Sequence, residues 1–266
     1  MAIANSLALL LYLACSVTLI RHFVQDGKSL SLALPVGFLT VLALILHGTD
    51  IFFTMRAVDG WDVSLFSTMT IVAWLMAFVA YLLGLKCNAA HPGIVIYPLV
   101  ALTLIVKSTI PSTSLDGLST PALEWHVLLS LTAYSLFTLA AVQAIVLAIQ
   151  EHQIRQRQLG GMMRQLPPLQ SMEASLFQLI SGGFILLTVG LIIGLVFLDD
   201  IMAQHLAHKT VLSLVAWCVF ATLLWGRWQH GWRSQTAIKW TLVGFSLLVL
   251  AYFGSKFVLE FILPQS

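Results

Sequence analysis

The residues of this chain best suited to chemistry are its eight histidines, because a neutral imidazole is a good ligand for iron and other transition metals. His47 ends one apolar segment and His126 begins another, so the topology described below predicts that both lie near the outer edge of a bilayer. Two imidazoles presented from different helices at equal depth can clamp a flat haem between them. His205 and His208 are three residues apart and share a face if their segment is helical.

The same histidines have other interpretations. A histidine at a membrane boundary can act only as an amphipathic anchor. A zinc or copper ion can replace haem, although zinc usually requires cysteine, carboxylate or further histidine in a tight tetrahedron. Asp50, three residues after His47, is a candidate carboxylate ligand or a candidate partner that orients the imidazole. The histidine pattern alone therefore leaves the bound species open.

Two tryptophans and one lysine accompany these histidines on the same side. Trp125 directly precedes His126, and Trp61 follows the segment that His47 ends. Indoles in such positions are typical of membrane interfaces and are equally suited to form the flat wall of a porphyrin site. Lys209 begins another apolar segment, where its ammonium group can extend toward the interface or pair with a haem propionate.

Long apolar segments must position all of these residues. Of the 266 residues, 59% are hydrophobic and only 9% are charged, whereas soluble domains carry about 25% charged residues. The apolar runs are continuous rather than alternating, which excludes a soluble globule and disfavours an outer-membrane barrel. We predict an all-α, polytopic membrane protein that forms a single integral membrane domain over residues 1–266. The eight expected spans are roughly 2–20, 31–47, 64–85, 93–106, 125–149, 175–198, 209–225 and 237–262.

The basic residues set the expected orientation. The loops after the first, third, fifth and seventh spans share one side and contain most of the arginines and lysines. Because cytoplasmic loops carry an excess of basic residues, we expect these loops to be cytoplasmic and both termini to lie outside. His47, His126 and Lys209 then lie at the outer face, and His152 lies at the cytoplasmic face.

Other kinds of chemistry find little support in the sequence. It shows no serine–histidine–aspartate arrangement and no glycine loop of the phosphate-binding type, so we expect no enzymatic activity. Its three cysteines lie far apart, and no motif for covalent haem attachment is present. The expected partner is lipid rather than nucleic acid. Gly190 and Gly194 form a small-residue motif that predicts close helix packing.

The segment from Trp125 onward carries several motifs in a fixed order. These are Trp125–Ser130 with Ala133–Ser135, Leu166–Leu169, Lys209–Thr210, Trp217, Arg227, Gly231–Arg233 and Ala251–Ser255. In this order they resemble the cytochrome c assembly protein superfamily (CcsA/CcmC/HemX-like), and most closely its small YpjD-like inner-membrane subgroup. The resemblance covers residues 120–262 well, whereas the first 120 residues match in helix number and little else.

This resemblance implies a haem-binding or haem-handling protein of a bacterial inner membrane, with both termini periplasmic and with haem b held non-covalently. His126 takes the position of the family's outer-face haem ligand, and His47 is the expected opposite ligand, with His208 in reserve. Trp125 and Trp61 would then wall the ring, and Lys209 would meet a propionate. Other membrane proteins of cytochrome assembly or transport are the expected partners.

The chain also departs from the haem–cytochrome synthetases of that superfamily. Their tryptophan-rich loop corresponds here to Leu198–His208, which contains no tryptophan, and Trp225 stands where they have a transmembrane histidine. We therefore expect one outer-face bis-histidine haem site at most, and no synthetase activity. One alternative is a membrane accessory or transport subunit, related to metal ions, that binds no haem. A second alternative is a family member that binds nothing and regulates a partner.

Overall fold

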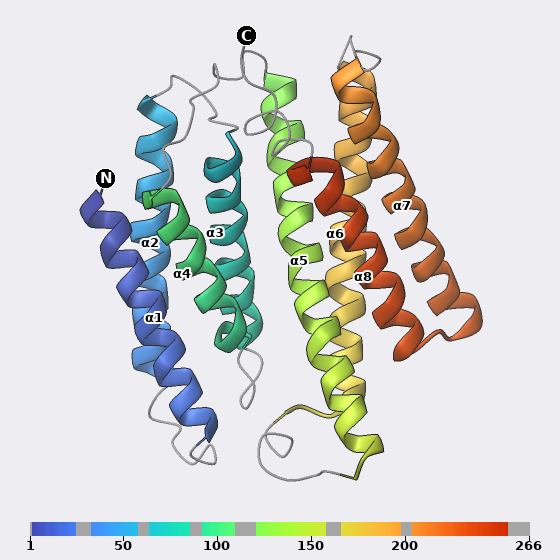
Figure 1. Ribbon diagram of the computed structural model, residues 1–266, viewed down its shortest axis with the longest axis horizontal. Coiled ribbons are helices and arrows are strands. Elements are labelled where there is room, and N and C mark those ends of the chain that lie inside the picture. Colours follow the sequence, from blue (N-terminus) through green and yellow to red (C-terminus); the bar gives the residue numbers. More distant parts are fainter. Residues whose placement is uncertain are drawn as a thin grey trace. The chain divides into compact units, whose positions relative to one another are not determined.

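The computed structural model describes residues 2–24, 33–57, 64–85, 92–109, 121–157, 166–197 and 204–254. Within these residues the chain forms α-helices, and the last of them, α8, continues into one π-helical turn (Figure 1). Their bounds are α1 Ala2–Val24, α2 Ala33–Ala57, α3 Leu65–Gly84, α4 Gly93–Thr109, α5 Pro121–Arg155, α6 Leu169–Phe197, α7 Gln204–His230, α8 Gln235–Val249 and η3 Leu250–Gly254. Seven of these helices are long and apolar enough to cross a membrane, and α4 is a shorter apolar helix. The predicted all-α membrane protein with about eight spans is confirmed.

Some helices differ in length from the expected spans. Helix α5 has 35 residues, which corresponds to about 52 Å and exceeds the hydrocarbon thickness of about 30 Å. It begins at Pro121, a residue that is well suited to a first helical position because it lacks an N–H. The last expected span, 237–262, is not one α-helix in its described part. It changes from α to π geometry at Leu250, and residues 255–262 lie outside the described part of the chain.

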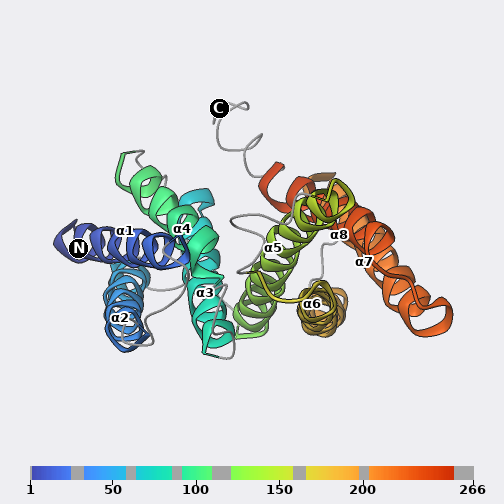
Figure 2. The same cartoon turned by 90° about the horizontal axis from the view of Figure 1, so that it is seen from below.

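The chain divides into two compact units. Unit 1 comprises residues 1–117 and 153–168, and unit 2 comprises residues 118–152 and 169–266. Helices α1 to α4 therefore belong to unit 1, whereas α6 to α8, η3 and most of α5 belong to unit 2 (Figures 1 and 2). The expectation of a single membrane domain stays a prediction.

Unit 1 holds buried polar groups between α1, α2 and α4. The Nζ atom of Lys107 on α4 lies 2.6 Å from an Asp50 carboxylate oxygen on α2, and it lies 3.4 Å from the Thr54 hydroxyl. A buried charge requires such a partner, because removing a charged group from water costs free energy unless an opposite charge or hydrogen bonds compensate for it. Trp74 on α3 donates to the Leu44 carbonyl of α2 at 2.8 Å, and it packs against Gly48.

Unit 2 is organised around two stacked phenylalanines. Phe137 of α5 and Phe220 of α7 stack with ring centroids 4.0 Å apart. A Cβ added at Gly183 of α6 would lie 3.1 Å from the Phe137 ring, and one added at Gly244 of α8 would lie 2.7 Å from the Phe220 ring. The two glycines thus leave space for the rings. The two rings and the two glycines form one packed layer, to which each of α5, α6, α7 and α8 contributes a residue.

A tight turn returns α8 alongside α7. Gly231 has φ +65°, its N–H bonds the Arg227 carbonyl, and the Trp232 N–H bonds the Gly226 carbonyl. The bond from the Gly231 N–H to the Arg227 carbonyl is that of an αL cap, whose left-handed residue is usually glycine. Arg227 also pairs with Glu173 of α6 at 2.5 Å, which ties this end of the unit together. The turn therefore sends α8 back toward the end of unit 2 where α5 and α7 begin.

Candidate functional site

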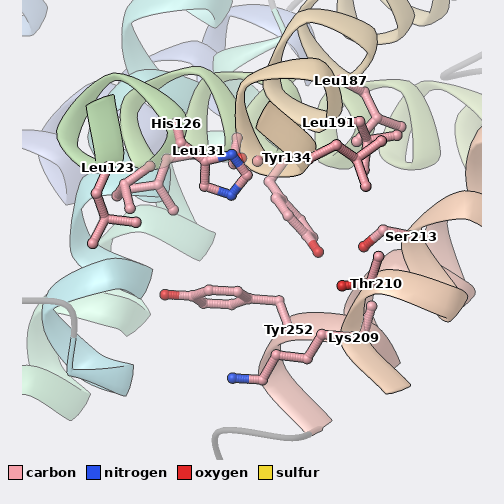
Figure 3. Close-up of a pocket in the computed structure, with 15 residues that line it drawn as sticks. Leu123, His126, Leu131, Tyr134, Leu187, Leu191, Lys209, Thr210, Ser213 and Tyr252 are labelled. Carbon is pink, nitrogen blue, oxygen red and sulfur yellow. The ribbon is translucent and has the colours of Figure 1, made fainter. Parts of the chain in front are cut away.

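A pocket lies at that end of unit 2, where α5 and α7 begin and where α6 and η3 end. Its volume is about 240 Å³. Leucines from α5 and α6 supply much of its lining, and one imidazole, two phenols, one ammonium group and small hydroxyls supply its polar groups (Figure 3). The lining includes His126, Tyr134, Lys209 and Tyr252, so two of the predicted site residues, His126 and Lys209, meet in it.

His126 is held in a defined orientation. Its Nδ1 atom lies 2.8 Å from the carbonyl oxygen of Gly190 on α6. Because a carbonyl oxygen can only accept, Nδ1 must carry the proton, and Nε2 of the neutral ring then keeps its lone pair. The imidazole projects from α5 into the space that Tyr252 borders from the opposite side (Figure 3). A neutral imidazole whose other nitrogen donates to a carbonyl is the usual arrangement of a metal-ligating histidine.

Two tyrosines that were not predicted as site residues also line the pocket. The Tyr134 hydroxyl donates to the Leu248 carbonyl at 3.0 Å, and this carbonyl lies two residues before the helix changes to π geometry. Tyr252 lies in the π turn, and its ring centroid is 5.7 Å from that of Tyr134. Because π turns are rare and recur at functional sites, the turn is a structural sign that sequence reasoning could not provide.

Lys209 enters the pocket from the start of α7. Its side chain is half-buried and lies near Thr210 and Tyr252 in the lining (Figure 3). Lys209 has no carboxylate partner among the described residues, unlike Lys107 with Asp50 and Arg227 with Glu173. A half-buried ammonium group beside apolar walls is suited to an anionic group on an otherwise apolar ligand.

His47 lies in unit 1 and has a different environment. Its side chain is 0% exposed, and its Nδ1 atom lies 3.5 Å from the Tyr12 hydroxyl of α1. The Tyr12 and His47 rings meet edge to face, and Tyr97 of α4 packs against Tyr12. The buried Nε2 atom has no hydrogen-bond partner among the described residues. In this structure, the His47 side chain is fully buried in the packing of unit 1.

The prediction for Asp50 requires a correction. Asp50 was a candidate ligand or orienting partner for His47, but its carboxylate binds Lys107 at 2.6 Å, and the hydrogen-bond partner of His47 is Tyr12. The reason is electrostatic, because an ammonium group satisfies a buried carboxylate better than a neutral imidazole does.

Among the described residues, no other predicted site residue lines this pocket. Trp125 is 61% exposed and is not part of the pocket lining. Trp61 lies outside the described residues. His208 lies in the first turns of α7, which begins at Gln204, but its side chain is outside the described part of the structure. Their roles at a ligand site stay predictions.

The fold and the pocket define a class of protein: a polytopic helical membrane protein with an imidazole and an ammonium group in an apolar pocket at the end of one helical unit. The comparison with protein families is more specific. The family described as cytochrome C assembly protein matches residues 3–263, and the chain belongs to this family.

Three relatives show how this family membership extends over the chain. Inner membrane protein YpjD of Escherichia coli (strain K12) is 30% identical over 205 residues, which cover 77% of this chain and 78% of that protein. Protein HemX of Brevibacillus brevis is 20% identical over 93% of each chain. The cytochrome c biogenesis protein CcsA of Guillardia theta is 21% identical over 73% of each chain. The predicted membership of this superfamily, with its YpjD-like similarity, is confirmed.

Proposed function

We propose that this membrane protein of the cytochrome c assembly family handles haem, and that it holds one non-covalent haem b in the pocket of unit 2 with His126 as an axial ligand. The observation that carries the proposal is the hydrogen bond from His126 Nδ1 to the Gly190 carbonyl, which leaves the Nε2 lone pair for a metal. Relatives named for cytochrome c biogenesis support it, because cytochromes c are haem proteins.

The donor set of the pocket suits this ligand. Haem, when bound, supplies an iron that accepts a nitrogen lone pair and two carboxylates that need cationic partners. Leu123, Leu187 and Leu191 offer apolar surface to a flat ring, and His126 offers one nitrogen ligand. A cavity of about 240 Å³ is slightly smaller than typical ligand pockets of roughly 300–1,000 Å³. A porphyrin would therefore be only partly enclosed by the residues of unit 2.

Each polar residue of the pocket has a distinct part in this proposal. His126 binds through Nε2 and is oriented through Nδ1. Lys209 holds a propionate by charge-assisted hydrogen bonding, and Tyr252 covers the side of the space that faces His126. The sequence predicts His47, with His208 in reserve, as the opposite ligand, and our proposal takes only His126 from that pair. His47 would have to leave its contact with Tyr12 to take that role.

The cellular setting belongs to the same proposal. We place the protein in a bacterial inner membrane, as the name of YpjD states for that relative, with both termini on the periplasmic side. Its partners are other membrane proteins of cytochrome assembly or transport, and it acts as a carrier or accessory rather than as an enzyme. The orientation is testable by labelling with an impermeant thiol reagent. A cysteine at Ser108 would react from outside, and a cysteine at Gln156 would not.

A titration of the purified protein in detergent separates the candidate functions. Added haemin is expected to give a saturable, shifted Soret band with the wild type and with the control His152→Ala, which changes an exposed residue at the other end of α5. His126→Ala should lose this band or change it. The metal-accessory alternative predicts binding of Zn²⁺ without a Soret shift, and a purely regulatory protein would bind neither. Within the described residues there is no group of three or more histidines, cysteines or acids for a bare metal ion.

A further inference from the structure

Helix α6 contacts α5 beside His126 at Gly190. A Cβ added at Gly190 would lie 3.4 Å from the Ser130 hydroxyl oxygen, 3.9 Å from the Ser130 backbone nitrogen and 4.0 Å from the Leu129 Cβ. Gly190 therefore lets the backbone of α6 approach the backbone of α5 one turn after His126. A long side chain at this position would push the two helices apart.

Gly194, one helical turn after Gly190 in α6, affects how exposed the Gly190 carbonyl is. Helical side chains lean toward the N-terminus, so the side chain of a residue covers the turn before it. A side chain at position 194 would thus lie over the carbonyl of Gly190, four residues earlier. Gly194 is buried and lines the His126 pocket. Because Gly194 has no side chain, nothing at its own position covers the Gly190 carbonyl.

An open helical carbonyl can accept a second hydrogen bond. Its first lone pair serves the N–H four residues later, and its second is available to a lateral donor. Here that donor is His126 Nδ1, at 2.8 Å. The bond needs both a short distance between the helices and an uncovered oxygen, and the two glycines provide one condition each.

We propose that Gly190 and Gly194 are positioning residues that fix His126 in its Nδ1–H form and present its Nε2 atom to the pocket. This role rests on the proposed function only for the identity of the ligand. A pair of small residues in a membrane helix ordinarily serves packing alone. The same two helices provide a matched comparison two turns away. At Gly182 an added Cβ would lie 3.3 Å from the end of the Leu136 side chain, remote from His126.

The tautomer can be measured on the full chain without any ligand. In protein labelled with ¹⁵N-histidine, the ring signals of His126 are those lost in His126→Gln. The wild type and the control Gly182→Leu are expected to show a protonated Nδ1 and an unprotonated Nε2. Gly190→Leu should shift His126 to the Nε2–H form or to exchange between both forms. Gly194→Val, which places a side chain over the carbonyl, should do the same and serves if Gly190→Leu does not fold.

Haem titration supplies the second readout. Loss of an orienting partner typically weakens metal binding about 10- to 100-fold, so both variants should bind haemin that much more weakly than Gly182→Leu does. Retention of the Nδ1–H form in Gly190→Leu and Gly194→Val would overturn the inference, and so would a changed tautomer with unchanged haemin affinity. A wild type that has the Nδ1–H form but binds no haemin would instead contradict the proposed function and leave the tautomer assignment intact.

Discussion

His47 and His126 begin from the same sequence-based expectation, a histidine near the outer edge of the bilayer, and reach opposite environments. His47 is completely enclosed in unit 1 beside Tyr12, with a buried Nε2 atom that lacks a partner among the described residues. His126 of unit 2 is half-buried, bonds a backbone carbonyl through Nδ1 and borders a pocket. An equal expected depth in a membrane therefore does not predict equal access, because the rotation of a helix decides which side chains reach a cavity.

The lysines of the two units show the same contrast. Lys107 of unit 1 is paired with Asp50 at 2.6 Å, so its charge is compensated within the helices. Lys209 of unit 2 borders the pocket and forms no ion pair with the part of the chain that the structure describes. The lysine of unit 1 is thus paired within its own unit, whereas Lys209 of unit 2 borders the pocket where the proposed ligand would bind. Each of the following variants tests one side of this contrast.

The largest expected effect is on the cohesion of unit 1. Asp50→Asn leaves the Lys107 ammonium group without its counter-charge, and breaking a buried pair in this way costs about 3–5 kcal/mol. We expect the lower end of this range, because Lys107 is 19% exposed. Thermal unfolding in detergent measures the loss, and the double variant Asp50→Asn/Lys107→Met should recover much of it. A single variant as stable as the wild type would show that the pair contributes nothing.

A smaller effect is expected at Lys209, on binding rather than on stability. Lys209→Met keeps the length of the side chain but removes the charge that would hold a propionate. The affinity for haemin should fall about tenfold, which corresponds to roughly 1.4 kcal/mol. Haemin dimethyl ester has no free carboxylate and serves as the matched ligand, so the wild type and the variant should bind it equally. Equal loss with both ligands would mean that Lys209 supports the pocket in some other way.

The smallest effect is expected at His47. In His47→Leu an apolar side chain replaces an imidazole whose Nε2 atom is buried without a hydrogen bond and whose contact with Tyr12 is long, at 3.5 Å. The unfolding free energy should change by less than about 1 kcal/mol, because the loss of the Tyr12 contact is offset by the removal of a buried nitrogen that has no hydrogen bond. Haemin affinity should stay within about twofold. A large loss of affinity would identify His47 as a ligand and would remove the contrast between the units.

The sequence predicts where the helices lie along the chain, but it does not predict which face of each helix is buried. The apolar run 64–85 predicts α3, Leu65–Gly84, almost to the residue, because length and hydropathy suffice for a span. A helix that is apolar all round has no distinct buried face, so the pattern of α2 could not reveal that His47 faces inward.

The predicted site was partly accessible from the sequence for similar reasons. His126 and Lys209 each follow from a residue type at a helix start, and the fold brings them together. Tyr252 and the Gly190 carbonyl depend on a π turn and on a lateral backbone bond, and neither has a sequence pattern that predicts it. Gly190 and Gly194 signal close packing, but which carbonyl they uncover is visible only in three dimensions.

The most direct test of the central claim compares His126→Ala and His47→Ala in one haemin titration monitored by absorption. Our account predicts that His126→Ala loses the shifted Soret band or binds haemin at least tenfold more weakly, because the iron loses its oriented nitrogen ligand. It predicts a nearly unchanged spectrum for His47→Ala, whose side chain is enclosed in unit 1. Identical spectra and affinities of the wild type and His126→Ala would contradict the account.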